Sequence, residues 1–396
     1  MFEQVTTAPP DAILGLTEAF NADANPNKIN LSVGVYKDAN GTTPVLGTVK
    51  EAERRLLETE KTKSYKPMTG DPAYGKLVRA LVFGDSHDLV AGGRAITAHT
   101  PGGTGALRVA GDYLHRLHPE ASIWLSDPTW ANHNGIFTAA GLNINKYAYF
   151  DASINAVNFD KMFDSLKQIP AGDVVLLHGC CHNPTGADPT VAQWEQLGDL
   201  LAERGITPLV DFAYQGLGDG IDADAAGVRA LAAKVDELFV CTSFSKNFGL
   251  YNERTGALTV VCKNTDHAAA VASQVKVTIR TNYSNPPAHG AAIVTTVLDD
   301  ADLRAKWEEE VADMRQRING MRQLFVEKMH ALKPDHDFGF IVDQRGMFSF
   351  SGLTKQQVET LKTKDSIYIV GSGRINVAGM TESNMDALCE AITRVL

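Results

Sequence analysis

The sequence has little cysteine and no excess of basic residues. Its 396 residues include five cysteines, and the adjacent pair Cys180 and Cys181 fits neither a disulfide framework nor repeated CxxC metal motifs. The formal net charge of -10 argues against nucleic acid or an anionic membrane as a partner, because both require a concentrated basic surface. We expect a reducing compartment, no metal site, and local arginines wherever an anionic ligand binds.

The chain also lacks a long apolar run and a basic leader. No uncharged apolar run approaches the roughly 20 residues of a membrane helix. The first residues carry Glu3, Asp11 and Glu18 with no basic residue before Lys28, the reverse of a secretory or mitochondrial targeting segment. With 44% hydrophobic and 21% charged residues, the composition is ordinary for a globular protein of two or three domains. We expect a soluble cytoplasmic protein.

Short apolar runs alternate with helical patterns along the chain. The runs predict buried strands at 122–127, 173–180, 207–214, 237–244 and 257–262. The segment 188–205 has apolar residues at helical spacing and a terminal glycine, which together predict a helix. Strand, helix and strand in turn indicate an α/β fold with a parallel sheet. Ligands bind beyond the carboxyl ends of such strands, so we expect four polar stretches to share one crevice: Asp127, 178–183, 211–214 and 243–246.

The pattern changes after about residue 300. Apolar residues recur there at intervals of three or four, namely Trp307, Val311, Met314, Ile318, Met321 and Phe325. They predict one amphipathic helix of about 25 residues, nearly 40 Å long, running from one domain into another. Beyond it, 338–353 and 366–379 are interpreted as short strands of a small α+β domain. We expect an N-terminal arm and part of the small domain at 1–47, a large domain at 48–313, and the small domain at 314–396.

Two motifs carry chemistry. The segment 99–114, "HTPGGTGALRVAGDYL", predicts a glycine-rich turn opening a helix, whose free N–H groups suit a phosphate, although a purely structural turn is an alternative. It lacks the last glycine of GxGxxG and the GKS/T ending of a P-loop. The segment 242–256, "TSFSKNFGLYNERTG", places Lys246 directly after a predicted buried strand. Burial lowers the pKa of a lysine, so such a residue has an anionic partner or acts as a nucleophile.

The combination of these features points to pyridoxal 5′-phosphate. Asp211 and Tyr214 follow one strand, and Asn183 lies in the turn of "HGCCHNPTG". Taken singly, Asp211 fits a helix cap, Tyr214 a core tyrosine and Asn183 a tight turn. Together with Lys246 and a phosphate cradle they meet the needs of this coenzyme: lysine supplies the imine, and a carboxylate keeps the pyridine nitrogen protonated.

Ordered motifs over essentially the whole chain then carry a family resemblance. They include "LSVGVYKD", "TPGGTGALR", "SDPTWANH", "HGCCHNPTG", "DFAYQG", "SFSKNFGLYNERTG", "NYSNPPAHGA", "GMFSFSGL" and "SGRINVAG", after "ILGL" near the N-terminus. The sequence resembles bacterial aspartate aminotransferases of the fold-type I pyridoxal phosphate family, in the subgroup that also holds aromatic aminotransferases. The resemblance implies a large domain with a mostly parallel seven-stranded sheet flanked by helices, and a smaller α+β domain joined by a long helix.

The resemblance also implies roles for the residues around the coenzyme. Lys246 is the Schiff-base lysine and proton carrier, and Asp211 pairs with the pyridinium nitrogen with His133 behind it. Tyr214 and Asn183 bind the phenolic oxygen. Trp130 stacks on the ring. The phosphate is held by Gly103, Thr104, Ser243 and Arg254, and by Tyr65 of the neighbouring subunit.

For the substrate, the resemblance implies two arginines and a homodimer with shared active sites. Arg374 grips the α-carboxylate, beside Trp130 and Asn183. Arg280 of the partner subunit meets the distal carboxylate, although a non-catalytic ion pair is an alternative for this residue. Gly34 lies in a segment that closes on the substrate.

We therefore expect a ping-pong reaction of L-aspartate and 2-oxoglutarate to oxaloacetate and L-glutamate. By the same resemblance, Val35, Lys37, Thr43, Thr104 and Asn285 are expected to line the cleft, and they are the polar or small types of the dicarboxylate-specific branch. Ser64 departs from the asparagine expected there, which leaves aromatic or dual specificity as the alternative. Three further alternatives are a nicotinamide-dependent dehydrogenase, an inactive interaction protein, and β-elimination or decarboxylation. The missing last glycine of GxGxxG argues against the dehydrogenase. The presence of every candidate residue argues against an inactive protein. The two arginines argue against β-elimination or decarboxylation.

Overall fold

The computed structural model describes residues 2–7 and 14–396, so part of the "ILGL" motif lies outside the described residues. The core is a seven-stranded sheet in the order β2–β10–β9–β8–β7–β3–β4. Strand β10 is antiparallel to both neighbours and all other pairs are parallel. The strands are β2 Ala95–Pro101, β3 Ser122–Asp127, β4 Asn143–Ala148, β7 Val174–His178, β8 Thr207–Phe212, β9 Leu238–Ser243 and β10 Thr255–Val261. The predicted mostly parallel sheet is confirmed.

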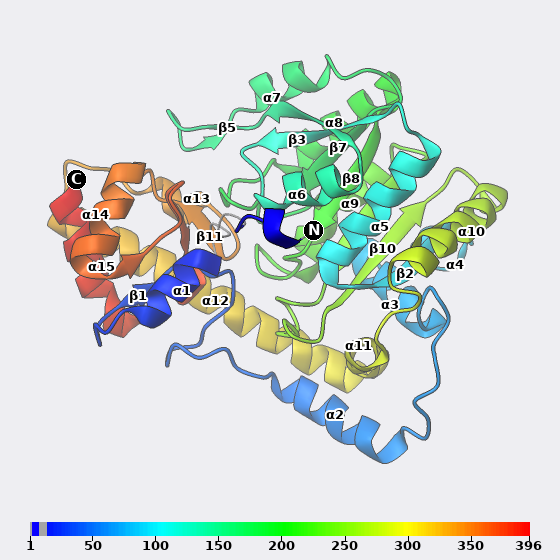
Figure 1. The fold of residues 1–396 in the computed structure, drawn as a ribbon, viewed down its shortest axis with the longest axis horizontal. Coiled ribbons are helices and arrows are strands. Elements are labelled where there is room, and N and C mark those ends of the chain that lie inside the picture. Colours follow the sequence, from blue (N-terminus) through cyan, green and yellow to red (C-terminus); the bar gives the residue numbers. More distant parts are fainter. Residues whose placement is uncertain (1, 8–13) are drawn as a thin grey trace.

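Each predicted apolar run is a strand of this sheet. Every residue of β7, β9 and β10 is buried, because helices cover both faces of the sheet (Figure 1). The edge strand β4 was not predicted, because it is largely exposed and its residues do not form an apolar run. A two-stranded ribbon, β5 Phe150–Asp151 with β6 Ala156–Val157, follows β4.

The helices around the sheet begin and end at recognisable signals. The predicted helix at 188–205 is α8 Val191–Arg204, which Thr190 caps in a capping box with Gln193 and which ends at left-handed Gly205. The glycine-rich turn opens α5 Gly102–Leu117, as predicted. The other helices of this part are α3 Pro72–Phe83, α4 Asp88–Ala91, α6 Asn132–Ala139, α7 Phe159–Leu166, α9 Ile221–Ala232, α10 Thr265–Asn282 and α11 Ala288–Asp299.

The long amphipathic helix is α12, Ala301–Leu332, and all six apolar residues predicted on its inner face are buried. At 1.5 Å per residue its 32 residues span about 48 Å. Figure 1 shows α12 running from α11 beside the large sheet to the C-terminal helices. One element therefore connects both parts of the molecule.

The smaller part packs on the far end of α12. It contains α13 Phe340–Asp343, β11 Phe348–Phe350, α14 Lys355–Asp365, β12 Ile367–Tyr368, β13 Arg374–Asn376, the 3-10 turn η2 Val377–Gly379 and α15 Glu382–Val395. Strand β11 pairs with β13, and β12 pairs with β1 Ile29–Asn30, which brings the N-terminal segment and α1 Leu14–Ala22 to this part. The prediction of strand across 338–353 was wrong at its start. Phe338 and Ile341 are buried three residues apart, which is helical rather than strand spacing.

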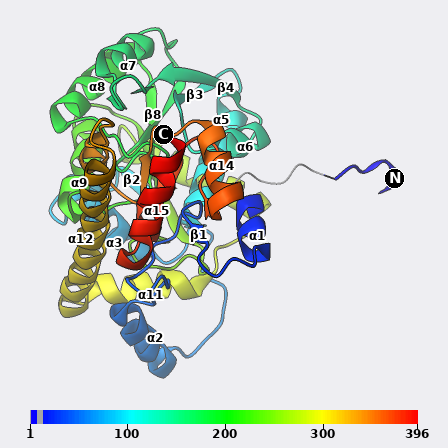
Figure 2. The same cartoon turned by 90° about the vertical axis from the view of Figure 1, so that its left-hand side faces the viewer.

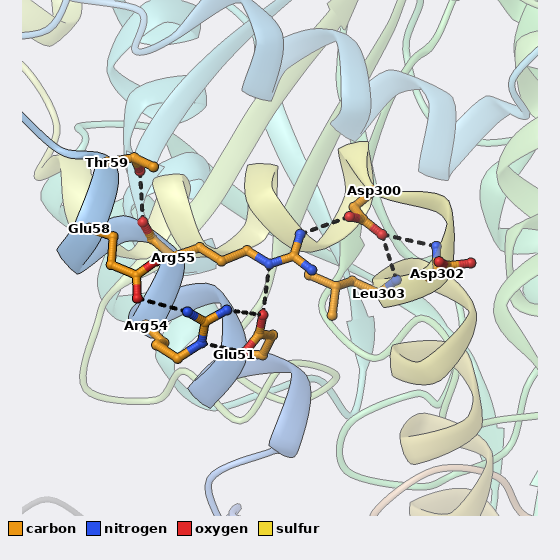
Figure 3. Close-up of polar contacts among 8 residues, drawn as sticks. All are labelled: Glu51, Arg54, Arg55, Glu58, Thr59, Asp300, Asp302 and Leu303. Carbon is orange, nitrogen blue, oxygen red and sulfur yellow. Dashed lines mark hydrogen bonds and ion pairs between the residues drawn. The ribbon is translucent and has the colours of Figure 1, made fainter.

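Helix α2, Gly47–Thr59, is fastened alongside α12 by polar contacts. Glu310 accepts a hydrogen bond from the backbone N–H of Gly47 at 2.6 Å, and Arg55 pairs with Asp300 at 2.7 Å. Arg55 also binds Glu51, and Asp300 caps α12 (Figure 3). These side chains are partly exposed, so solvent screens each ion pair and its contribution to stability is small. At the other end of the N-terminal segment, residues 2–7, with η1 Phe2–Gln4, lie away from the body of the chain (Figure 2).

Candidate active site

A cavity of about 180 Å³ lies at the carboxyl ends of β8 and β9, against the start of α5. Its lining includes most of the predicted site residues: Gly34, Gly103, Thr104, Trp130, Asn183, Asp211, Tyr214, Ser243, Lys246 and Arg254. The predicted convergence of strand ends is thus confirmed for β8 and β9 and for the turn after β7. It was wrong for Asp127, which is outside the cavity and pairs with Lys146 at 3.1 Å. Both of these side chains are more than half exposed, because β3 ends beside the edge strand β4.

Lys246 lies in the turn directly after β9. Its Nζ lies 4.8 Å from the centre of the Tyr214 ring and forms no ion pair with any described carboxylate. Burial lowers the pKa of Lys246 to about 8; the Asp211 carboxylate opposes this shift, and the Arg254 guanidinium adds to it. A sizeable fraction of the amine is therefore neutral near physiological pH, as a nucleophile or proton carrier requires.

The turn that carries Lys246 is held from behind by the long helix. The indole Nε1 of Trp307 in α12 donates to the backbone oxygen of Asn247 at 2.8 Å, and Trp307 stacks on Phe248 with ring centres 4.5 Å apart. The Asn247 amide donates in turn to the backbone oxygen of Gln215 at 3.0 Å. The lysine turn is thereby joined to the loop after β8.

Behind Asp211 runs a chain of buried hydrogen bonds. His133 Nε2 lies 3.1 Å from Asp211 Oδ2, and His133 Nδ1 lies 2.8 Å from the hydroxyl of Thr129. The same hydroxyl is 3.2 Å from Nε2 of His178, whose Nδ1 faces the backbone N–H of Asn183 at 3.5 Å.

The donor and acceptor of each of these hydrogen bonds follow from the protonation state of His178, at the end away from Asp211. Burial lowers the pKa of His178 to about 3, so its ring is neutral, and its Nδ1 must accept from the Asn183 N–H. His178 Nε2 then donates to Thr129, Thr129 donates to His133 Nδ1, and His133 Nε2 donates to Asp211. Burial alone would raise the pKa of Asp211, but this hydrogen bond, with nearby His178 and Lys246, holds it below its ordinary value. Asp211 is a fixed, buried carboxylate.

A second polar group closes the other wall. The Asn183 amide nitrogen lies 3.4 Å from the Tyr214 hydroxyl, and its oxygen accepts from Nη1 of Arg374 at 3.4 Å. Burial, reinforced by the Asp211 carboxylate, raises the pKa of Tyr214, so its hydroxyl stays protonated. Nη2 of Arg374 donates to the Ser32 backbone oxygen at 2.5 Å.

The start of α5 forms an anion cradle with Arg254. The helix has no side-chain cap, so the N–H groups of its first turn, at Gly103 and Thr104, are free to bind a ligand. Gly102 has a left-handed backbone, with φ of 71°, which favours glycine, and a Cβ there would lie 2.6 Å from Nη2 of Arg254. Arg254 itself has a left-handed backbone, with φ of 52°, a conformation that costs free energy at a non-glycine residue.

Arg254 and Arg374 share one property that defines the site. Neither guanidinium pairs with a carboxylate among the described residues, and Nε of Arg374, in a side chain only 4% exposed, has no hydrogen-bond partner. Arg254 is exposed, whereas Arg374 is buried, and buried charges are otherwise paired in proteins. The two unpaired cations suit a ligand with two separate anionic groups, such as a phosphate and a carboxylate.

Tyr65 and Arg280 are not brought to this cavity. Both line a different, open pocket of about 1000 Å³, together with Ser64 and Asn285. The Tyr65 side chain is 93% exposed, and Arg280 donates to the Ser284 hydroxyl at 2.5 Å. Both residues are therefore accessible on the surface of this chain.

Sequence reasoning missed several residues of the site. Tyr251 and Ser245 line the cavity, and Thr129 completes the chain behind Asp211. The Tyr251 hydroxyl accepts the backbone N–H of Tyr36 at 2.9 Å and so fixes the segment that carries Gly34. Tyr251 and Ser245 belong to the same motif as Lys246, and Thr129 precedes Trp130, so position within a motif was the available signal.

One group of potential metal ligands occurs among the described residues, outside the cavity: Cys180, Cys181 and Asp224. Both oxygens of Asp224 already accept backbone N–H groups, from Gly216 and Asp219 among others, and burial raises the pKa of Cys180. A protonated thiol is a poor metal ligand. The cavity residues instead suit an organic cofactor with a phosphate and a carbonyl carbon that reacts with an amine.

Fold and site together define an α/β enzyme class with a reactive lysine and anion-binding groups at the carboxyl edge of the sheet. The chain belongs to the aminotransferase class I and II family, whose sequence pattern matches residues 26–392. This confirms the resemblance read from the motifs. Among the residues that the structure describes, none of the helices has the length and apolar character of a membrane span.

Similar proteins span the full chain. The aspartate aminotransferase of Escherichia coli K12 is 54% identical over 396 residues, which are 100% of both chains. The aromatic-amino-acid aminotransferase of Pseudomonas aeruginosa is 45% identical over 394 residues, 100% of this chain and 98% of that protein. Among solved structures, the aromatic-amino-acid aminotransferase from Burkholderia pseudomallei, covalently bound to pyridoxal phosphate, has a TM-score of 0.97 at 48% identity. It covers 100% of this chain and 99% of that one.

Proposed function

We propose that this protein is a pyridoxal phosphate-dependent aminotransferase that converts L-aspartate and 2-oxoglutarate to oxaloacetate and L-glutamate by a ping-pong mechanism. The observation that carries the proposal is the buried, unpaired guanidinium of Arg374 in contact with Asn183 of the cavity that holds Lys246. A reactive amine beside a carboxylate-binding group is what amino acid chemistry at the α-carbon requires. The 54% identity to a protein named aspartate aminotransferase supports the choice of substrate, since the relatives cited here that are named for aromatic amino acids are 42–48% identical.

The residues present fit the coenzyme. Its phosphate is assigned to Gly103 and Thr104 at the start of α5, with Ser243 and Arg254, and its ring nitrogen to the fixed carboxylate of Asp211. Tyr214 and Asn183 are assigned to the phenolic oxygen, and Trp130 to the ring face. When bound, pyridoxal phosphate supplies a carbonyl carbon for the amine and an electron sink for the pair released at the substrate α-carbon.

Lys246 has two tasks in this mechanism. Its neutral amine holds the coenzyme until substrate arrives, and then carries the proton away from the substrate α-carbon and back. The pKa of about 8 suits both tasks, because the amine exchanges a proton readily near neutral pH. Asp211, held ionised by His133, keeps a positive charge on the ring nitrogen. The protonated Tyr214 hydroxyl donates a hydrogen bond to a negative oxygen beside the amine.

Arg374 is assigned to the substrate α-carboxylate and Arg280 of a second copy to the distal carboxylate. Arg374 already contacts the cavity residue Asn183 through Nη1. The segment with Gly34 is assigned to cover the substrate, since Gly34 lines the cavity and the nearby Tyr36 N–H is bound by the Tyr251 hydroxyl of the same cavity. Closure of that segment excludes water and strengthens both ion pairs.

A homodimer is part of the proposal. Tyr65 and Arg280 share an open pocket on the surface and neither lines the cavity of its own chain, whereas a two-fold partner would contribute the same pair in return. The exposed N-terminal residues 2–7 are assigned to an arm on the partner, with Phe2 84% exposed. The domain limits 1–47, 48–313 and 314–396 are retained, with the boundary inside α12. The cytoplasm is the proposed compartment, since all five cysteines are free.

The proposal is tested with the coenzyme-loaded protein by measuring kcat/KM for L-aspartate and L-phenylalanine, with 2-oxoglutarate as acceptor. A strong aspartate preference supports the two-arginine assignment. Comparable values would place the protein in the aromatic branch and make Ser64 the first position to mutate. Release of ammonia or CO₂ without transfer to the oxo acid would overturn transamination in favour of elimination or decarboxylation. The Lys246→Ala variant is expected to fold and to show no turnover.

A further inference from the structure

The turn that follows β7, residues 179–187, is bound by the carboxylate of Asp188. Oδ2 of Asp188 accepts the backbone N–H of Cys181 at 2.6 Å, and Oδ1 accepts the backbone N–H of His182 at 2.9 Å. Two successive N–H groups that converge on one carboxylate form an anion-binding nest. Cys181 has a left-handed backbone, with φ of 52°, a conformation that costs free energy at a non-glycine residue. The charge-assisted bonds to Asp188 therefore stabilise this unusual turn.

The same turn places Asn183 in the catalytic cavity. The three hydrogen bonds of Asn183 are long. Its backbone N–H lies 3.5 Å from Nδ1 of His178, and its side chain lies 3.4 Å from both the Tyr214 hydroxyl and Nη1 of Arg374. Hydrogen bonds of this length are at the edge of the usual range, so a small displacement of the turn would break them. The contacts of Asn183 therefore depend on the groups that fix the turn.

Other contacts hold the turn through different atoms. The ring of His182 lies 3.0 Å from the Ser126 hydroxyl and 2.9 Å from the Thr185 hydroxyl. The smaller part of the molecule also rests on the turn, because the N–H of Arg345 donates to the backbone oxygen of Gly186 at 2.6 Å. Loss of the carboxylate should therefore shift the turn rather than unfold it.

We propose that Asp188 is a positioning residue for the proposed transamination and that it acts through Asn183. The carboxylate fixes the turn, and the turn places the Asn183 amide between the Tyr214 hydroxyl and the Arg374 guanidinium. Asp188 itself does not line the cavity. The inference rests on the proposed function, in which Asn183 binds the phenolic oxygen of the coenzyme.

The test is a double-mutant cycle of Asp188→Asn and Asn183→Ala in the coenzyme-loaded protein at pH 8.5. Burial raises the pKa of Asp188 to about 7, although the two N–H groups oppose this rise, so the side chain is ionised at the pH of the test. Asparagine keeps the shape of the side chain, but its amide oxygen replaces two carboxylate oxygens as the acceptor.

Two quantities are measured. One is kcat/KM for L-aspartate with 2-oxoglutarate. The other is the visible absorbance of the bound coenzyme, which differs according to whether Nζ of Lys246 carries a proton and does not depend on the substrate. A hydrogen bond donated to the phenolic oxygen weakens the attraction of that oxygen for this proton. Loss of the Asn183 contact should therefore favour the protonated form.

Each single variant should lower kcat/KM at least about tenfold and raise the ratio of protonated to unprotonated coenzyme at least about threefold. Because both substitutions affect one contact, Asp188→Asn should change either quantity less than about twofold in the Asn183→Ala background. Asp173→Asn is the matched control, since Asp173 accepts the N–H of Ser122 at 2.9 Å and the indole N–H of Trp124 at 2.8 Å. Asp173 precedes the amino end of β7, away from the cavity, so this control should leave both quantities unchanged.

Four results would overturn the inference. Additive effects in the double variant would show that Asp188 does not act through Asn183. An absorbance change in Asn183→Ala but not in Asp188→Asn would remove the role of Asp188 and leave the proposed function standing. No absorbance change in either variant would contradict the assignment of Asn183 to the phenolic oxygen, and hence the proposed function as well. Loss of the folded state in Asp188→Asn, measured by urea unfolding, would show that the carboxylate holds the fold as a whole.

Discussion

Replacing Arg374 by methionine should abolish most activity without harming the fold. The side chain is 4% exposed, its Nε has no hydrogen-bond partner, and no described carboxylate pairs with it. Methionine has a similar length, is flexible, and can pack against Phe348, whose ring lies 4.3 Å from the guanidinium carbon. The substitution therefore separates a ligand-binding role from a structural one.

The expected magnitudes follow from burial. A substrate carboxylate that loses its buried partner costs about 3–5 kcal/mol, which corresponds to a decrease of about 10²- to 10⁴-fold in kcat/KM. Because aspartate and phenylalanine both carry an α-carboxylate, the loss should be similar for both. For stability, the variant loses the bonds to Ser32 and Asn183 but also removes an unpaired buried charge. Replacing such a charge by an apolar group is often neutral or stabilising, so the free energy of unfolding should change by less than about 1 kcal/mol.

Two assays decide the matter: kcat/KM for both amino acids with 2-oxoglutarate, and urea unfolding of the coenzyme-free protein. Destabilisation by more than about 2 kcal/mol would refute the reasoning, because it would show that Arg374 holds the fold through Ser32 and Asn183. Loss of activity with aspartate alone would contradict the assignment to the α-carboxylate.

Three other predictions concern the remaining charged groups. Arg280→Ala should lower kcat/KM for aspartate about 10²-fold or more and leave phenylalanine within about tenfold, and equal losses would contradict the distal-carboxylate assignment. His133→Leu removes the hydrogen bond that holds the pKa of Asp211 below 3.8. That bond stabilises the fold above about pH 4, and its contribution is lost as the pH falls through the folded-state pKa. The variant should therefore be about 2 kcal/mol less stable by urea unfolding at pH 7 and approach the parent below pH 4; a constant difference would argue against ionised Asp211. Lys246 in the coenzyme-free protein releases its proton near pH 8, whereas the unfolded chain holds it to about 10.5. Between these values the unfolded state binds more protons, so stability should rise with pH by up to about 3 kcal/mol, and Lys246→Met should remove that rise in a pH series of unfolding curves.

Local patterns predicted much of the fold. Continuous apolar runs identified the buried strands, because a strand covered on both faces has no reason to alternate. The spacing from Trp307 to Phe325 identified α12, because its inner face is buried along its length. Predictions from apolar patterns were incomplete or wrong at two places, an exposed strand and a short helix. Strand β4 is exposed at the sheet edge, and the turn at 340–343 places Ile341 inward at helical spacing.

Motifs by themselves selected the residues that we propose carry the chemistry: a lysine after a strand, a carboxylate at the end of the neighbouring strand, and a glycine-rich helix start. Their residue types and order limit the coenzyme and reaction, since few cofactors require that set. Only the tertiary structure decided which hydrogen bonds and ion pairs these groups form. It ordered the donors from Asn183 through His178 and Thr129 to Asp211, left Arg374 without a carboxylate partner among the described residues, and kept Asp127 out of the cavity. The reason is physical: a hydrogen bond, a pKa and an unpaired charge depend on distances between residues far apart in the chain, which local sequence does not specify.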